Sequence, residues 1–172
     1  MSQHEAIDNT DFGVSVQPSP GSHTLKCLSA TLLRGETDGK AWARLRLRVR
    51  SKTEPNADTF ADSMFVPTVE DVAVAEAARQ GESTPGFEPE QIEMRLDRVK
   101  AFGKMLKRWG VVAVADAAAL EAFASDAESK LEKFKGAEAD ARVYFVDQRD
   151  FTTKEPRLGA DGEVLKETKI GY

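Results

Sequence analysis

Ala, Leu or Val alternates with Trp or Arg over residues 41–50. A period of two predicts a β-strand with one buried and one exposed face. The buried face would carry Ala43, Leu45, Leu47 and Val49, and the exposed face Trp42, Arg44, Arg46, Arg48 and Arg50. Asp38-Gly39 precedes this strand and is a typical hairpin turn, so a β-compatible segment over residues 22–34 is predicted to be its antiparallel neighbour.

Three more segments have the composition of strands: residues 58–68, 142–148 and 164–172. The last two flank a loop over residues 149–163 that contains Pro, Gly and Asp. Both alternating sets of residues 60–66 include apolar side chains, so the pattern leaves open whether Phe65 faces the core or the solvent. The sequence thus predicts five strands.

Helical periodicity fills the interval between the third and fourth strands. Apolar residues recur at steps of three or four from Ile92 to Leu106, which predicts a helix over residues 89–109 that ends at Gly110. Shorter helices are predicted over residues 69–80 and 116–123. The element order is therefore three strands, helices and two strands.

This order predicts a mainly β fold with a helical insertion at about residues 69–136. It is the order of the OB-fold, a five-stranded, partly open Greek-key barrel, and it is also compatible with other small α+β sheets. Residues 21–172 would form this single domain. Residues 1–20 are polar, contain two prolines and lack periodicity, so they are predicted to be a flexible N-terminal tail.

Composition narrows the function classes. No apolar run approaches the ~18 residues of a membrane span, and no secretory signal is recognisable, so we expect a cytoplasmic protein without membrane contact. One cysteine and two histidines show no metal-ligand spacing, so no metal site or cofactor is predicted. No nucleotide-binding or nucleophile motif occurs, and we predict that the protein is not an enzyme.

The net charge of −5 conceals strong segregation of charge. Residues 40–52 carry six basic residues and no acid: Lys40, Arg44, Arg46, Arg48, Arg50 and Lys52. Arginine can bind phosphate oxygens in a bidentate manner, and an exposed Trp42 ring offers a surface for base stacking. This strand face is therefore predicted to bind a single nucleic-acid strand. The competing interpretation is a solvated strand whose arginines pair with acids on neighbouring strands.

Further nucleic-acid contacts are predicted from the two C-terminal strands. If Val143 points inward, Arg142 and Tyr144 point outward, although Tyr144 could also be a core residue. The loop over residues 149–163 is predicted to be mobile and to close over bound DNA with Arg149, Phe151, Lys154 and Arg157. Lys100, Lys104 and Lys107 share a helix face that is either solvated or a second DNA path.

Four segments together resemble a known family. Residues 21–30, 42–49, 105–110 and 134–146 are similar to bacteriophage OB-fold single-stranded DNA-binding proteins, a family first recorded as uncharacterised phage proteins. The resemblance implies a protein that coats single-stranded DNA without sequence preference in replication or recombination and carries no cofactor. It also implies partners, namely further copies of itself in a homo-oligomer or cooperative filament, and replication or recombination proteins.

Two features leave the function open. Many single-strand binders end in an acidic tail, whereas residues 166–172 contain two lysines and one glutamate, which departs from that pattern. The alternative function is a protein-interaction or assembly module that uses the same basic strand face to dock an acidic partner. The two functions differ in salt dependence, which is steep for contacts to a nucleic-acid backbone.

Overall fold

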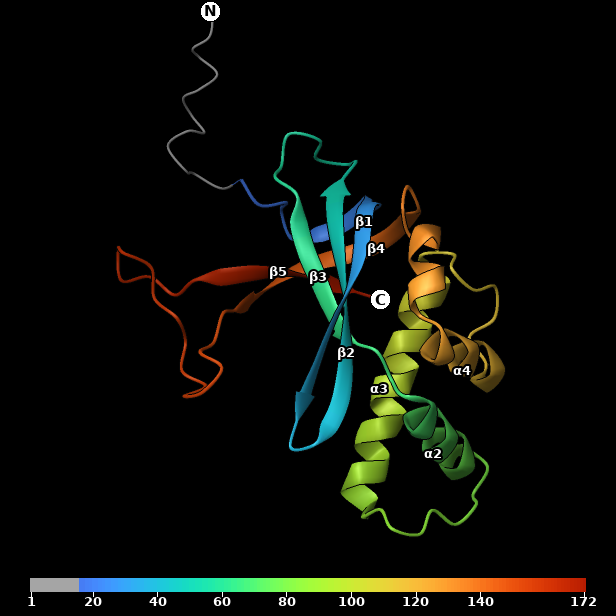
Figure 1. Ribbon diagram of the computed structural model, residues 1–172. Coiled ribbons are helices and arrows are strands. Elements are labelled where there is room, and N and C mark those ends of the chain that lie inside the picture. Colours follow the sequence, from blue (N-terminus) through green and yellow to red (C-terminus); the bar gives the residue numbers. More distant parts are fainter. Residues whose placement is uncertain (1–15) are drawn as a thin grey trace, which may run out of the picture.

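The computed structural model describes residues 16–172 (Figure 1). It contains five strands, β1 (Gly21–Thr37), β2 (Lys40–Ser51), β3 (Phe60–Phe65), β4 (Glu138–Asp147) and β5 (Lys166–Gly171). Between β3 and β4 the chain forms α2 (Val69–Arg79), α3 (Pro89–Arg108), α4 (Ala117–Ser125) and the 3-10 helix η1 (Glu128–Lys133). The prediction of a mainly β chain with five strands and accompanying helices is confirmed.

The strands form one antiparallel sheet in the order β3-β2-β1-β4-β5. Strands β1 to β3 follow one another as hairpins, and β4 returns after the helices to lie beside β1, which is a Greek-key arrangement. No backbone ladder joins β3 to β5, so the sheet is not closed. The two edges are linked instead by side chains: the Trp109 indole N–H donates to the Tyr172 hydroxyl at 3.0 Å, and that hydroxyl donates to Asp62 at 2.9 Å.

Strand β1 is long enough to pair with two neighbouring strands. Its first part, from Gly21 to Lys26, pairs with β4, and its later part pairs with β2. The register shifts between Cys27 and Ser29, where a β-bulge accentuates the twist and bends the strand from one partner to the other. At its end the predicted Asp38-Gly39 turn is present, with φ angles of 52° and 73°.

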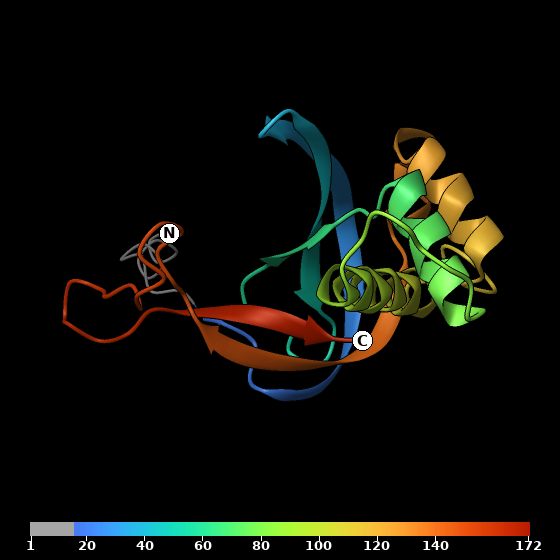
Figure 2. The same ribbon diagram turned by 90° about the horizontal axis from the view of Figure 1, so that it is seen from below.

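The core lies between the inward face of the sheet and α3. Leu45, Leu47 and Val49 point inward from β2, as their alternation predicts. They belong to one buried cluster with Phe102 and Leu106 of α3. The other helices pack beside α3 on the same side of the molecule, as Figures 1 and 2 show.

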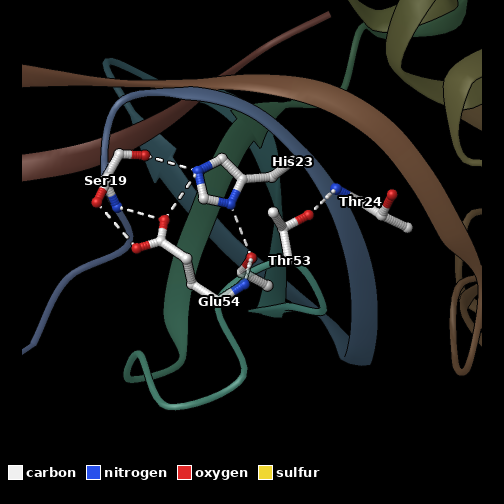
Figure 3. Close-up of polar contacts among 6 residues, drawn as sticks. Ser19, His23, Thr24, Thr53 and Glu54 are labelled. Carbon is white, nitrogen blue, oxygen red and sulfur yellow. Dashed lines mark hydrogen bonds and ion pairs between the residues drawn. The ribbon is translucent and has the colours of Figure 1, made fainter.

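The described chain begins with an anchored segment rather than a loose one. Figure 3 shows Ser19 held by the Glu54 carboxylate through its backbone N–H and its hydroxyl, both at 2.9 Å. These hydrogen bonds lower the pKa of Glu54. His23 lies beneath them, donates from Nε2 to the Ser19 carbonyl at 2.6 Å and contacts the Ser51 hydroxyl through Nδ1 at 2.7 Å. Val16 also exchanges backbone and side-chain hydrogen bonds with Asp58.

The predicted tail over residues 1–20 therefore needs a boundary correction. Residues 1–15 lie outside the described residues. Residues 16–20 do not form a loose tail, because Pro18 is fully buried and Ser19 is fixed by Glu54. The anchor could not be predicted from the sequence, because the residues that hold it lie in the connection between β2 and β3, more than thirty residues away along the chain.

Candidate nucleic-acid interface

The outward side of β2 carries a row of arginines. Arg44, Arg46, Arg48 and Arg50 are all exposed, while every residue between them is buried. Neighbouring guanidinium groups start from backbone positions about 6.8 Å apart, because two residues separate them along the strand. The row is the feature that the alternating sequence predicts.

The strands on either side offer these arginines no acid. Opposite Arg46 lie Thr31 of β1 and Ser63 of β3, and opposite Arg48 lie Ser29 and Ala61. Within residues 16–172, none of the four arginines makes an ion pair. Four like charges on one face repel one another, so an anion bound along the row would relieve this repulsion. The competing interpretation, in which neighbouring acids neutralise the row, has no support in the described part of the chain.

Aromatic rings lie at the hairpin end of the row. Trp42 packs edge to face with Phe65 of β3, with ring centroids 6.2 Å apart, and its indole N–H donates to the Thr37 hydroxyl at 3.1 Å. The Trp42 ring also covers Gly35 on β1 so closely that a Cβ atom there would lie 2.2 Å from it. Gly35 thereby provides the space in which the ring rests.

Phe65 and Arg98 join this surface, and the predicted site did not include them. Phe65 is 41% exposed and lies opposite Arg44, whose guanidinium is 5.0 Å from the ring centroid. Arg98 reaches the same ring from α3 at 5.6 Å. The register between β2 and β3 settles the face of Phe65, and the docking of α3 brings in Arg98. No local pattern in the sequence signals either contact.

The ends of the basic segment differ in their surroundings. Lys40 is exposed beside the β1–β2 turn. Lys52 makes an ion pair with Glu138 of β4 at 2.8 Å, so its charge is already balanced. We therefore define the arginine face as Trp42, Arg44, Arg46, Arg48 and Arg50 of β2, together with Phe65 of β3 and Arg98 of α3.

Arg142 and Tyr144 are exposed on β4, but the structure does not bring them to the arginine face. Two acids, Glu138 and Asp140, precede them on the same side of β4 and lie nearer to β2. Tyr144 instead borders a hollow of about 520 Å³ that is also lined by Lys100 and Lys104 of α3. Arg142 shares a neighbouring hollow with Arg108. These residues thus belong to a separate basic surface.

The loop over residues 149–163 forms its own hydrogen-bonded structure at the end of the β4–β5 hairpin. Isolated bridges join Arg149 to Pro156 and Leu158 to Val164. The Arg149 guanidinium also donates to the Lys154 carbonyl at 2.8 Å. In Figures 1 and 2 the loop projects away from the tip of the β1–β2 hairpin.

The side chains of this loop remain accessible. Phe151 is 89% exposed, and the Lys154 ammonium lies 4.7 Å from the centre of its ring. Arg157 is exposed as well. No contact within residues 16–172 links these three side chains to β2, so their closing over DNA stays a prediction.

Other chemistry in the described chain is sparse. Cys27 is buried, and desolvation raises the pKa of its thiol to about 11, so it stays protonated at neutral pH. Among residues 16–172, no three His, Cys, Asp or Glu side chains converge as a metal site would require. None of the helices in this part of the chain combines the length and the apolar character of a membrane span.

Comparison with known proteins adds no relative to this picture. No family model matches the chain, and neither the curated proteins nor the solved structures that were searched include a match.

Proposed function

We propose that the protein binds single-stranded DNA without sequence preference through the arginine face and acts in phage DNA replication or recombination. The observation that carries the proposal is the row of four exposed arginines on β2, unpaired within residues 16–172 and bordered by the rings of Trp42 and Phe65. Arginine contacts follow the phosphate backbone, and aromatic rings stack on bases of any sequence.

A single strand suits this face better than a duplex does. In a duplex the bases stack on one another and their faces are inaccessible, whereas an extended single strand presents them to protein rings. Phe65, which is 41% exposed, and the half-buried Trp42 lie on the same face as the arginines, so backbone and bases can be held together. Contacts to phosphates and base faces carry little sequence information, which supports sequence-independent binding.

The sheet topology supports binding of an oligonucleotide at the position that OB-folds use. OB-folds are partly open Greek-key barrels that bind oligonucleotides on the face of their second and third strands, between the loops that follow the first and fourth strands. Here the arginine face lies on β2 and β3, and the corresponding connections are the Asp38-Gly39 turn and the loop over residues 149–163. The resemblance to phage single-strand binders points in the same direction.

A binding titration tests the proposal. Fluorescein-labelled oligothymidine would be titrated with the protein and with a variant that combines Trp42→Ala, Arg46→Ala and Arg48→Ala. We expect at least about a tenfold loss of affinity, because several backbone contacts and a stacking ring disappear at once. The protein should also bind the single strand more tightly than a duplex of the same length.

A matched control uses Lys130→Ala with Lys133→Ala in η1, where Lys130 is half-buried and Lys133 is exposed. This control removes two positive charges outside the arginine face and should bind nearly as well as the unmodified protein. Undiminished affinity in the β2 variant, with the fold intact by circular dichroism, would overturn the assignment. In that case DNA would bind elsewhere on the protein, and docking of an acidic protein would be the remaining proposal for the basic face.

A further inference from the structure

A groove of about 980 Å³ lies between α2, α3 and α4. Its walls are mainly apolar and include Val72, Ala75, Leu96, Val99 and Leu120. Nothing in residues 16–172 fills it. Its lining includes no residue of the arginine face, so it is a second surface with its own chemistry.

The floor of the groove is formed by close packing of small residues. At Gly103 of α3, an added Cβ atom would lie 3.2 Å from the Cβ of Ala115 and 3.6 Å from a methyl of Leu120. The glycine therefore lets the segment before α4 approach α3. This contact keeps the walls together and leaves room for a chain segment above them.

Lysines border the groove, and its acids are already engaged. Lys100, Lys104 and Lys107 are exposed on one side of α3 and make no ion pair within residues 16–172. The acid Glu76 pairs with Arg79, and Asp116 caps α4 by accepting from the Ala119 N–H. An occupant should therefore combine apolar side chains with negative charge.

Residues 1–15 of the chain have this composition. They contain three acids, Glu5, Asp8 and Asp11, and no lysine or arginine. They also contain apolar residues, among them Ile7, Phe12 and Val14. Three acids correspond in number to the three lysines beside the groove, which is the charge complementarity that the site requires.

The position of Val16 indicates which copy of the chain supplies this segment. Val16 is fixed to Asp58 by hydrogen bonds. In Figures 1 and 2 the described chain begins on the side of the sheet away from the helices. A segment of 15 residues reaches at most about 50 Å when fully extended, and its residues nearest to Val16 reach much less. Phe12 and Val14 therefore have access to a neighbouring molecule more readily than to the far side of their own.

We propose that the groove between α2, α3 and α4 binds residues 1–15 of a second copy of this chain. The donor and acceptor surfaces differ, so the contact is heterologous and can join copies in an open row. Such a row would suit a protein that coats a strand, but the proposal does not rest on the proposed function, because the groove and the arginine face are separate.

Charge reversal tests the contact on the full chain. One variant carries Lys100→Glu and Lys104→Glu in the groove, and the other carries Asp8→Lys and Asp11→Lys in the segment. Sedimentation velocity should show concentration-dependent association of the unmodified protein and at least about a tenfold weaker association of each variant alone. Mixing the two variants should restore association, because the reversed groove then meets the reversed segment and the unmodified segment of one variant meets the unmodified groove of the other.

A peptide titration identifies the occupant. A labelled peptide of residues 1–15 should bind the full chain and should bind the groove variant at least about tenfold more weakly. A scrambled peptide of the same composition is the peptide control, and Lys130→Glu with Lys133→Glu on η1 is the charge control. Affinity for short oligothymidine is measured on the segment variant, which leaves Lys100 and Lys104 in place and should not lose that affinity, so failure of this proposal and failure of DNA binding give different results.

Several results would overturn the proposal. The unmodified protein could remain monomeric at all concentrations, or the mixture of reversed variants could fail to associate. Equal binding of the scrambled peptide would show that charge alone, rather than this segment, is recognised. Displacement of the peptide by oligothymidine would show that the groove takes nucleic acid instead.

Discussion

The salt dependence of DNA binding tests the arginine face most directly. The perturbation is Arg46→Ala combined with Arg48→Ala at the centre of the row. Both side chains are exposed, and neither makes an ion pair within residues 16–172, so their removal leaves no described partner unsatisfied. We expect the fold to stay intact while the phosphate contacts are halved.

The expected magnitude follows from the number of arginines in the row. Each phosphate neutralised on a single strand contributes about −0.7 to the slope of log affinity against log salt, so four arginines give about −2.8. Raising the salt fourfold, from about 50 to 200 mM, should then weaken binding about 50-fold. With two arginines removed, the slope should be about −1.4 and the same salt step should cost only about sevenfold.

Fluorescence anisotropy of labelled oligothymidine at several salt concentrations measures these slopes. The variant Lys130→Ala with Lys133→Ala removes the same charge from η1 and should keep the slope of the unmodified protein. An unchanged slope in the Arg46 and Arg48 variant would refute the reasoning. A slope near zero for the unmodified protein, or an equal reduction in the control, would refute it as well.

Three further predictions concern the fold. Tyr172→Phe removes the hydroxyl that donates to Asp62, and urea unfolding should show that the free energy of unfolding falls by about 1–3 kcal/mol. Unchanged stability would mean that the link between the sheet edges is unimportant. Burial raises the pKa of Asp62, so ionisation of this carboxyl lowers the free energy of unfolding as the pH rises through its folded-state pKa. The variant Asp62→Asn should therefore gain stability relative to the unmodified protein between acid and neutral pH. A stability difference that does not change with pH would contradict this. In dilute solution, where copies of the chain are separate, deleting residues 1–15 should leave the melting temperature unchanged. Deleting residues 1–19 also removes buried Pro18, worth about 2 kcal/mol, and should lower the melting temperature by about 4–8 °C. Equal melting of both would show that the anchor is dispensable.

The sequence by itself determined the strand that carries the candidate site. Side chains alternate between the faces of any strand, so the pattern over residues 44–50 fixes which of them are exposed, whatever the neighbouring strands are. The Asp38-Gly39 turn is equally local, because it depends on positive φ angles that these residues adopt readily. Both features were predictable from a few adjacent residues.

Only the tertiary structure decided what surrounds that strand. Phe65 joins the arginine face through the register of β3 against β2, and Arg98 joins it through the docking of α3. Lys52 is balanced by Glu138, which lies 86 residues later in the chain. The curvature and pairing of β4 separate Arg142 from the arginines of β2, although all are basic and exposed. Such contacts depend on how distant segments pack together, and packing is a property of the whole chain that no short stretch of sequence encodes.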